Sequence, residues 1–197
     1  KVGVEGSKNI IKFSEDYTKI IFPSTHVVYE GLKDIEKNIK ESKPPVPVLE
    51  YAKGKFQTEQ DLKLSNKNYV ILRLGSVHGL SSDSTRLNVM PNLFAKIASQ
   101  NGSIKLFSGG KQLKSLVSVQ DVARCMQFVA ENNEISKSIF NCVSENVNVK
   151  KVATLCKKYS DSLKLVTSDD PIPNLGYTLS NKKILKEGFE FLYNLEN

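Results

Sequence analysis

Two short, nearly continuous apolar runs in the first part of the chain predict strands that are buried on both faces. Residues 19–23 form the first run and residues 69–74 the second. Such runs are typical of parallel sheets, because helices cover both faces of the sheet. We expect the first strand to end at Pro23, with residues 25–29 continuing along the strand end. Residues 75–79 should form the turn after the second strand.

Helical patterns flank these two runs. Residues 7–16 repeat apolar positions at helical spacing, with Ser7 at the position of a cap. Residues 50–64 favour a helix, and the polar, proline-rich residues 31–47 before them favour a loop. Helix, strand, loop, helix and strand in this order predict βαβ units, and therefore an α/β fold with a parallel sheet.

Shorter segments continue the alternation in the second part of the chain. The predicted helices cover residues 88–99, 121–129, 149–159 and 181–186. The predicted strands cover residues 103–107, 114–119, 138–143 and 163–166. Asp121 is expected to cap the second of these helices, and Gly188 is expected to end the last one.

The composition is that of a soluble globular protein, with 40% hydrophobic and 25% charged residues. No apolar run is long enough to span a bilayer, and the N-terminus has no signal peptide. We therefore expect a cytoplasmic protein without membrane attachment. The net charge of +7 comes from scattered lysines with few arginines and no interleaved aromatic residues, which favours a solvated surface over nucleic-acid binding.

The cysteines and histidines do not form a metal-binding pattern. Cys125, Cys142 and Cys156 are widely spaced and odd in number, so we expect reduced thiols that act as small apolar side chains. His26 and His78 are the only histidines. No metal site is expected from this set.

Candidate chemistry lies at the end of the first predicted strand and at the start of the helix over residues 50–64. Ser24 and Thr25 supply hydroxyls, and Tyr51 and Lys55 stand one helical turn apart. A phenol is a poor base at pH 7, but a nearby ammonium and a cationic nicotinamide stabilise the phenolate. A hydroxyl, a phenol and a lysine together therefore suggest hydride transfer at an alcohol or sugar carbon.

Other patterns favour structural roles. Tyr29 and Lys33 have the same spacing as Tyr51 and Lys55, but Gly31 breaks any helix between them. His26 and His78 could be acids or bases, although polar residues at loop ends are the favoured interpretation.

Taken in order, several segments resemble the extended short-chain dehydrogenase/reductase family, in its nucleotide-sugar epimerase and dehydratase branch. Residues 24–29 resemble its Ser-Ser/Thr-x-x-Val-Tyr-Gly strand end, and residues 51–55 its Tyr-x-x-x-Lys motif. Residues 72–79 resemble its Leu-Arg-x-x-Asn-x-x-Gly turn. Residues 88–91 resemble its Asn-Leu-Met-Pro segment, and residues 112–121 its Gln-x-Arg-Asp-Phe-x-x-Val-x-Asp block.

The resemblance implies a role for each matching residue. Tyr51 is the implied general acid or base, Lys55 binds the nicotinamide ribose, and Thr25 binds the substrate hydroxyl. The implied catalytic residues are thus Thr25, Tyr51 and Lys55. The implied cofactor-binding residues are Ser24, Tyr51, Lys55, Gly75 and Ser76, and the implied substrate-binding residues are Thr25, Ser76, Asn88 and Lys114.

Five positions depart from the family pattern, among them Glu30, which replaces the glycine of Val-Tyr-Gly. The dehydratase branch has Asp-Glu where this chain has His26 and Val27, and Val27 has no proton to exchange, so dehydration is not expected. Ser76 replaces an asparagine. Lys114 replaces an arginine, which keeps the charge but loses bidentate hydrogen bonding to phosphate.

The family also implies a cofactor-binding part that these residues lack. No Gly-x-x-Gly-x-x-Gly turn occurs in the chain, and the family would place about a hundred residues before Lys1. The expected fold is therefore a partial Rossmann-like parallel sheet with a small C-terminal substrate domain. Residues 1–79 would carry the catalytic residues and residues 80–197 the substrate part, with residues 112–143 returning to the main sheet.

The resulting expectation is a nucleotide-sugar epimerase-type oxidoreductase that uses NAD or NADP and is a homodimer in its longer parent protein. The isolated 197 residues would be inactive. One alternative is an NAD(P)H-dependent reductase of a sugar or small carbonyl compound. The other is a catalytically silent binding protein on the same fold.

Overall fold

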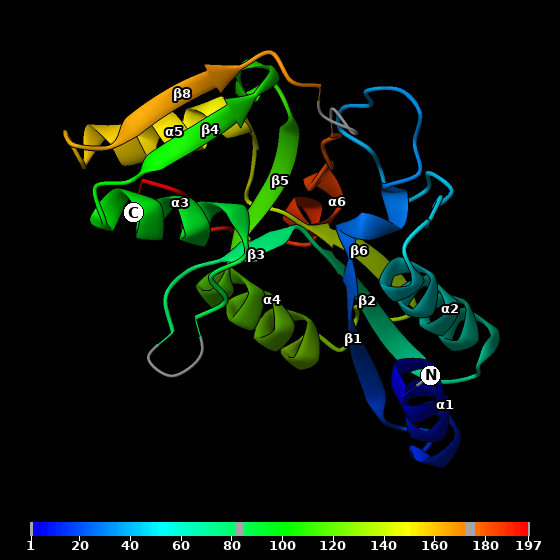
Figure 1. Cartoon of the computed structure of the whole chain (residues 1–197). Helices are drawn as coiled ribbons and strands as arrows, with labels where there is room; N and C mark the ends of the chain where they lie inside the picture. Colours follow the sequence, from blue (N-terminus) through cyan, green and yellow to red (C-terminus); the bar gives the residue numbers. More distant parts are fainter. Residues whose placement is uncertain (1, 82–84, 172–175, 197) are drawn as a thin grey trace.

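The computed structural model describes residues 2–81, 85–171 and 176–196, shown in Figure 1. The helices are α1 (Val2–Phe13), α2 (Glu50–Leu64), α3 (Met90–Ser99), α4 (Val119–Glu131), α5 (Val149–Lys158) and α6 (Lys182–Lys186), with 3₁₀ helices η1 (His26–Tyr29) and η2 (Ser108–Gly110). The strands are β1 (Lys19–Thr25), β2 (Asn68–Leu74), β3 (Ser76–His78), β4 (Ser103–Phe107), β5 (Leu113–Ser118), β6 (Ser138–Cys142), β7 (Glu145–Asn148) and β8 (Lys164–Ser168).

The main sheet has the strand order β1-β2-β6, and all of its strand pairs are parallel. Figure 1 shows α2 on one side of this sheet and α4 on the other. The side of β2 and β6 that faces α4 forms the largest apolar core cluster, which includes Val70, Leu72 and Phe140. The parallel sheet predicted from the apolar runs is therefore confirmed.

Two smaller sheets carry the remaining strands. β5 pairs in parallel with β3 and antiparallel with β7, and β4 pairs in parallel with β8. α3 and α5 pack against β4 and bury a separate apolar cluster around Ile104, Leu116 and Leu163. β7 was not predicted from the sequence, because its alternating residues 145–148 are short and mostly polar.

The structure changes the expectation for the end of the first strand. β1 continues through Pro23 to Thr25, and the following residues form η1 rather than extended chain. Pro23 is tolerated because β1 lies at the edge of its sheet within the described part of the chain. η1 forms because the Thr25 hydroxyl oxygen caps it, accepting a hydrogen bond from the Val27 N–H at 3.2 Å.

Three other local predictions were wrong. Residues 75–79 are not a turn, since β3 runs through most of them. α1 begins at Val2, so Ser7 lies inside it and donates to the Gly3 carbonyl oxygen instead of capping the helix. Ser118 caps α4 by accepting from the Asp121 N–H.

Candidate functional site

A cleft of about 660 Å³ opens at the carboxyl ends of β1 and β2. Ligands bind at this edge of open α/β sheets, because loops diverge there and leave a crevice. The cleft is lined by seven of the eight site residues predicted from the sequence: Ser24, Thr25, Tyr51, Gly75, Ser76, Asn88 and Lys114.

The two hydroxyls at the end of β1 have different partners. Ser24 donates its hydrogen to Glu59 Oε1 at 2.6 Å and is thereby bound to a buried carboxylate. Thr25 Oγ1 accepts the Val27 N–H, and among the described residues the hydroxyl hydrogen has no acceptor, so it can donate to a ligand. Of the two, Thr25 is therefore the one equipped to donate a hydrogen bond into the cleft.

α2 carries Tyr51, Lys55 and Glu59 at successive turns, with very different exposure. Glu59 is fully buried, Lys55 is partly buried, and the Tyr51 side chain at the cleft wall is 58% exposed. Lys55 Nζ donates to the Pro23 carbonyl oxygen at 2.7 Å and lies over the ring of Phe22. Burial lowers the pKa of the Lys55 ammonium. The Lys55 hydrogen bond thus links α2 to the end of β1 beside the cleft.

A buried ion pair behind the cleft was not found from the sequence. Arg73 in β2 donates to both carboxylate oxygens of Glu59, with Nε–Oε1 at 3.0 Å and Nη2–Oε2 at 2.6 Å. Arg73 also donates to the Tyr29 hydroxyl. The available signal was an arginine inside an otherwise apolar strand, since a buried guanidinium requires a partner.

The sequence suggested that His26 is a polar residue at a loop end, but the structure places it elsewhere. It lies in η1 at the cleft wall, with Nε2 3.2 Å from Ser76 Oγ and Nδ1 3.0 Å from the Tyr177 hydroxyl. Burial, and secondarily the charge of Lys114, lowers the pKa of His26 to about 4. The imidazole is therefore neutral at pH 7. Tyr177 is 151 residues away, so no local pattern could have indicated this contact.

Lys114 and Asn88 also line the cleft. Lys114 is partly buried, and burial lowers the pKa of its ammonium. Asn88 is exposed, and its Oδ1 accepts from Arg86 Nε at 2.9 Å. Gly75 is buried, and a Cβ there would lie 2.8 Å from the Ser115 carbonyl oxygen. The absence of a side chain at Gly75 thus lets β2 and β3 lie close to β5.

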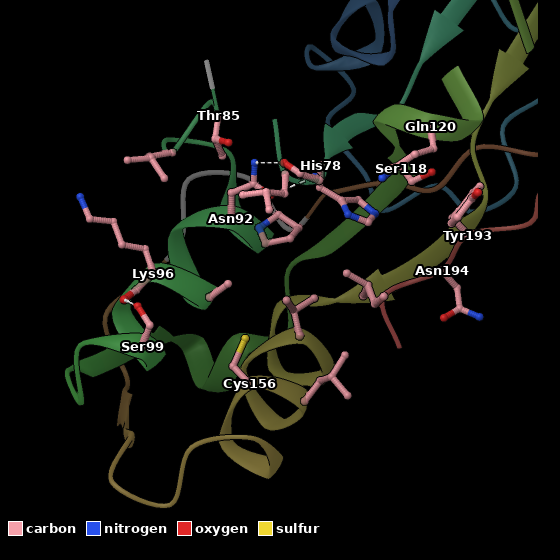
Figure 2. Close-up of a pocket in the computed structure, with 18 residues that line it drawn as sticks. His78, Thr85, Asn92, Lys96, Ser99, Ser118, Gln120, Cys156, Tyr193 and Asn194 are labelled. Carbon is pink, nitrogen blue, oxygen red and sulfur yellow. Dashed lines mark hydrogen bonds between the residues drawn. The ribbon is translucent and has the colours of Figure 1, made fainter. Parts of the chain in front are cut away.

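A second cavity, of about 620 Å³, lies between α3, α5 and the start of α4 (Figure 2). It shares His78, Gly79, Thr85 and Asn92 with the cleft but is lined by none of the predicted site residues. The Asn92 side chain bonds both backbone polar groups of Gly79. His78 Nε2 is buried and has no hydrogen-bond partner among the described residues, and burial lowers the pKa of His78.

The residues present fit one end of a dinucleotide. The phenol of Tyr51 and the ammonium of Lys55, both beside the end of β1, are suited to ribose hydroxyls and a nicotinamide ring. In the described ranges no cluster of three or more His, Cys, Asp or Glu side chains could hold a metal ion. Among the same residues, no helix is both long and apolar enough to cross a membrane.

Comparison with known proteins extends this description. Residues 1–142 match the NAD dependent epimerase/dehydratase family. An anthocyanidin reductase ((2S)-flavan-3-ol-forming) of Vitis vinifera is 28% identical over 186 residues, which are 84% of this chain and 52% of the relative. The chain therefore spans about half the length of that relative.

Two solved structures share the fold. UDP-glucose 4-epimerase of Thermotoga maritima with UDP-glucose has a TM-score of 0.82 at 22% identity, covering 98% of this chain and 65% of that chain. UDP-glucose 4-epimerase of Thermus thermophilus in complex with NAD has a TM-score of 0.82 at 21% identity, covering 99% and 67%. These similarities confirm the predicted Rossmann-like α/β fold.

The family match covers most of the chain, and the family is NAD-dependent, which agrees with the predicted cofactor. This protein therefore belongs to the NAD-dependent epimerase/dehydratase family.

Proposed function

We propose that this chain is the catalytic and substrate-binding portion of a nucleotide-sugar epimerase-type oxidoreductase. The observation that carries the proposal is the cleft itself, where Thr25, Tyr51 and Ser76 line one volume beside Lys55. Nicotinamide at this site would supply a hydride acceptor. NAD is the cofactor of the family, and the use of NADP by this protein stays an alternative.

In this proposal the chain's own residues bind the substrate and move its proton. Thr25 donates a hydrogen bond to the reacting oxygen, which holds that oxygen near Tyr51. Tyr51 takes the hydroxyl proton as the C–H carbon loses hydride, and the product of this half-reaction is a ketone. Return of hydride to the opposite face, with the proton returned by Tyr51, gives the epimer and no net redox change.

Lys114 and Asn88 are proposed to bind the substrate diphosphate. The cleft offers phosphate one ammonium at Lys114 rather than a guanidinium fork. The exposed amide of Asn88 lines the same cleft. A single ammonium imposes less geometric restriction than a guanidinium, so we expect the diphosphate to be held less rigidly here than by an arginine.

We also propose that two parts of the chain have different roles. Residues 1–79 would form the catalytic part, and residues 80–197 the substrate part. The pairing of β6 with β2 supports a return of the chain to the main sheet at residues 138–142. β5 pairs with β3 instead.

A reductase is the second candidate, and the anthocyanidin reductase relative favours it. The same Tyr51 would then donate its proton to a substrate carbonyl oxygen as hydride reaches the carbon. Net consumption of reduced cofactor separates this reaction from epimerisation. Dehydration is not proposed, because Val27 at the cleft wall has no group that could remove a proton.

The test is the Tyr51→Phe variant of the full-length protein, assayed with NAD for conversion of UDP-glucose to its C4 epimer. We expect turnover to fall by at least about 100-fold, because acid–base catalysis contributes about 10²–10⁴-fold. Binding of UDP-glucose should change much less. The matched control is Tyr159→Phe, which removes the same hydroxyl from an exposed tyrosine outside the cleft. Retained turnover in Tyr51→Phe would remove this residue from the mechanism.

A further inference from the structure

Three side chains from distant parts of the chain form a hydrogen-bonded row that leads inward from the cleft, with Ser76 and His26 at the cleft wall and Tyr177 buried beside His26. Ser76 begins β3, His26 begins η1, and Tyr177 lies in the C-terminal segment. Ser76 Oγ is 3.2 Å from His26 Nε2, and His26 Nδ1 is 3.0 Å from the Tyr177 hydroxyl. The Tyr177 hydroxyl also donates to the His26 carbonyl oxygen at 2.8 Å.

The last of these contacts determines the direction of the others. A carbonyl oxygen can only accept, so the Tyr177 hydrogen points to the His26 backbone. The Tyr177 oxygen must then accept from His26, which places a proton on Nδ1. Because the pKa of His26 is lowered to about 4, the ring is neutral and Nε2 carries no proton. Nε2 therefore accepts, and Ser76 donates to it.

This order leaves the Ser76 oxygen with lone pairs and no hydrogen to offer a ligand. Thr25, at the end of the neighbouring strand β1, has the opposite hydrogen-bonding role. Its oxygen accepts the Val27 N–H, and its hydrogen has no acceptor among the described residues. Both residues line the same cleft. Within the cleft, Thr25 thus offers a donor and Ser76 an acceptor, and this pair matches a carbonyl or alcohol oxygen next to a ligand hydroxyl.

We propose that His26 and Tyr177 are positioning residues that fix Ser76 as a hydrogen-bond acceptor, so that the cleft selects substrates with a free hydroxyl near the reacting carbon. The substrate part of this inference rests on the proposed function. The hydrogen-bond order does not, because it concerns only residues of this chain.

The order is measured directly by NMR on the chain labelled with ¹⁵N-histidine. Long-range ¹H–¹⁵N correlations at pH 7 report which ring nitrogen carries the proton. His78 is the only other histidine, and a His78→Gln variant assigns the two signals. We expect His26 to be neutral with its proton on Nδ1. A proton on Nε2, or an imidazolium ring at pH 7, would overturn the proposal.

Tyr177→Phe tests the source of this order. The variant removes the acceptor for the Nδ1 proton, so the population with the proton on Nε2 should rise. Tyr159→Phe is the matched control, and the His26 signals should be unchanged in it because this exposed tyrosine has no contact with His26. An unchanged tautomer in folded Tyr177→Phe would exclude a positioning role for Tyr177.

Fluorinated ligands test the selection, since fluorine replaces a hydroxyl with a group that cannot donate. The probes are UDP-glucose and its analogues with one sugar hydroxyl replaced by fluorine, titrated into the chain. We expect one analogue to bind about tenfold more weakly than UDP-glucose, and this difference to disappear in Ser76→Ala. An equal loss in wild type and Ser76→Ala would refute the selection.

Failure of UDP-glucose itself to bind would count against the proposed function. The tautomer measurement would still decide the hydrogen-bond order, so the two failures are distinguishable.

Discussion

The buried pair between Arg73 and Glu59 makes a quantitative prediction about stability. Its atoms join β2 to α2, and through Ser24 and Tyr29 it also reaches β1 and η1. Both side chains are almost completely inaccessible to solvent. Removal of either partner therefore leaves an uncompensated charge inside the protein, which is among the most destabilising single changes.

Arg73→Met removes the guanidinium and keeps an unbranched apolar chain. Glu59 then retains only the hydrogen bond from Ser24. We expect a loss of about 3–5 kcal/mol in the free energy of unfolding, which is typical for breaking a buried ion pair. Domains of this size are stable by about 5–15 kcal/mol, so the variant would lose a large share of its total stability.

The assay is urea unfolding followed by far-UV circular dichroism. Glu59→Leu is the second single variant, and Arg73→Met with Glu59→Leu completes a double-mutant cycle. The double variant should lose much less than the sum of the single losses, because no buried charge remains. Asp170→Asn is the control: it removes an ion pair to Lys105 whose side chains are both more than half exposed. Its urea midpoint should not change measurably.

Additive losses in the cycle would contradict the proposed coupling between Arg73 and Glu59. A loss of less than about 1 kcal/mol in the unfolding free energy of Arg73→Met would also contradict the prediction, because it would show that the Glu59 charge is not desolvated when Arg73 is removed.

Three further outcomes follow from the same structure. Asp121→Asn should lower the free energy of unfolding by about 1–3 kcal/mol, because this buried carboxylate accepts two backbone N–H groups of the C-terminal segment. The loss should appear as a lower urea midpoint, and an unchanged midpoint would contradict it. In native protein Cys156 should react with Ellman's reagent before the other two thiols, because it is partly exposed whereas Cys125 and Cys142 are fully buried. Its labelling should be slower than that of a free thiol, since burial raises the pKa of Cys156. Faster labelling of Cys125 or Cys142 would refute this order. The free energy of unfolding should fall by at most about 3 kcal/mol as the pH drops from 6.5 towards 4. The reason is that His26 takes up a proton in the unfolded state at a higher pH than in the folded state. Urea unfolding at each pH measures this dependence, and His26→Gln should weaken it.

The sequence by itself determined the class of fold and most of the elements. Continuous apolar runs are typical of strands in a parallel sheet, so β1 and β2 were predictable from the order of the residues. β2 is buried as expected, whereas the apolar residues of β1 are only partly buried, because β1 lies at the edge of the sheet in the described part of the chain. α2 matches the predicted residues 50–64, because its residues favour a helix and proline-rich chain precedes it. The ordered motifs also indicated residues that line one cleft.

Only the tertiary structure decided which groups those residues face. Hydrogen bonds across long separations carry no local signal, so neither the contact of His26 with Tyr177 nor that of Arg73 with Glu59 followed from spacing. Ser24 and Thr25 look equivalent as neighbouring hydroxyls, yet alternate residues of a strand point to opposite sides. One hydroxyl therefore binds a buried carboxylate, and the other keeps a free hydrogen beside the cleft.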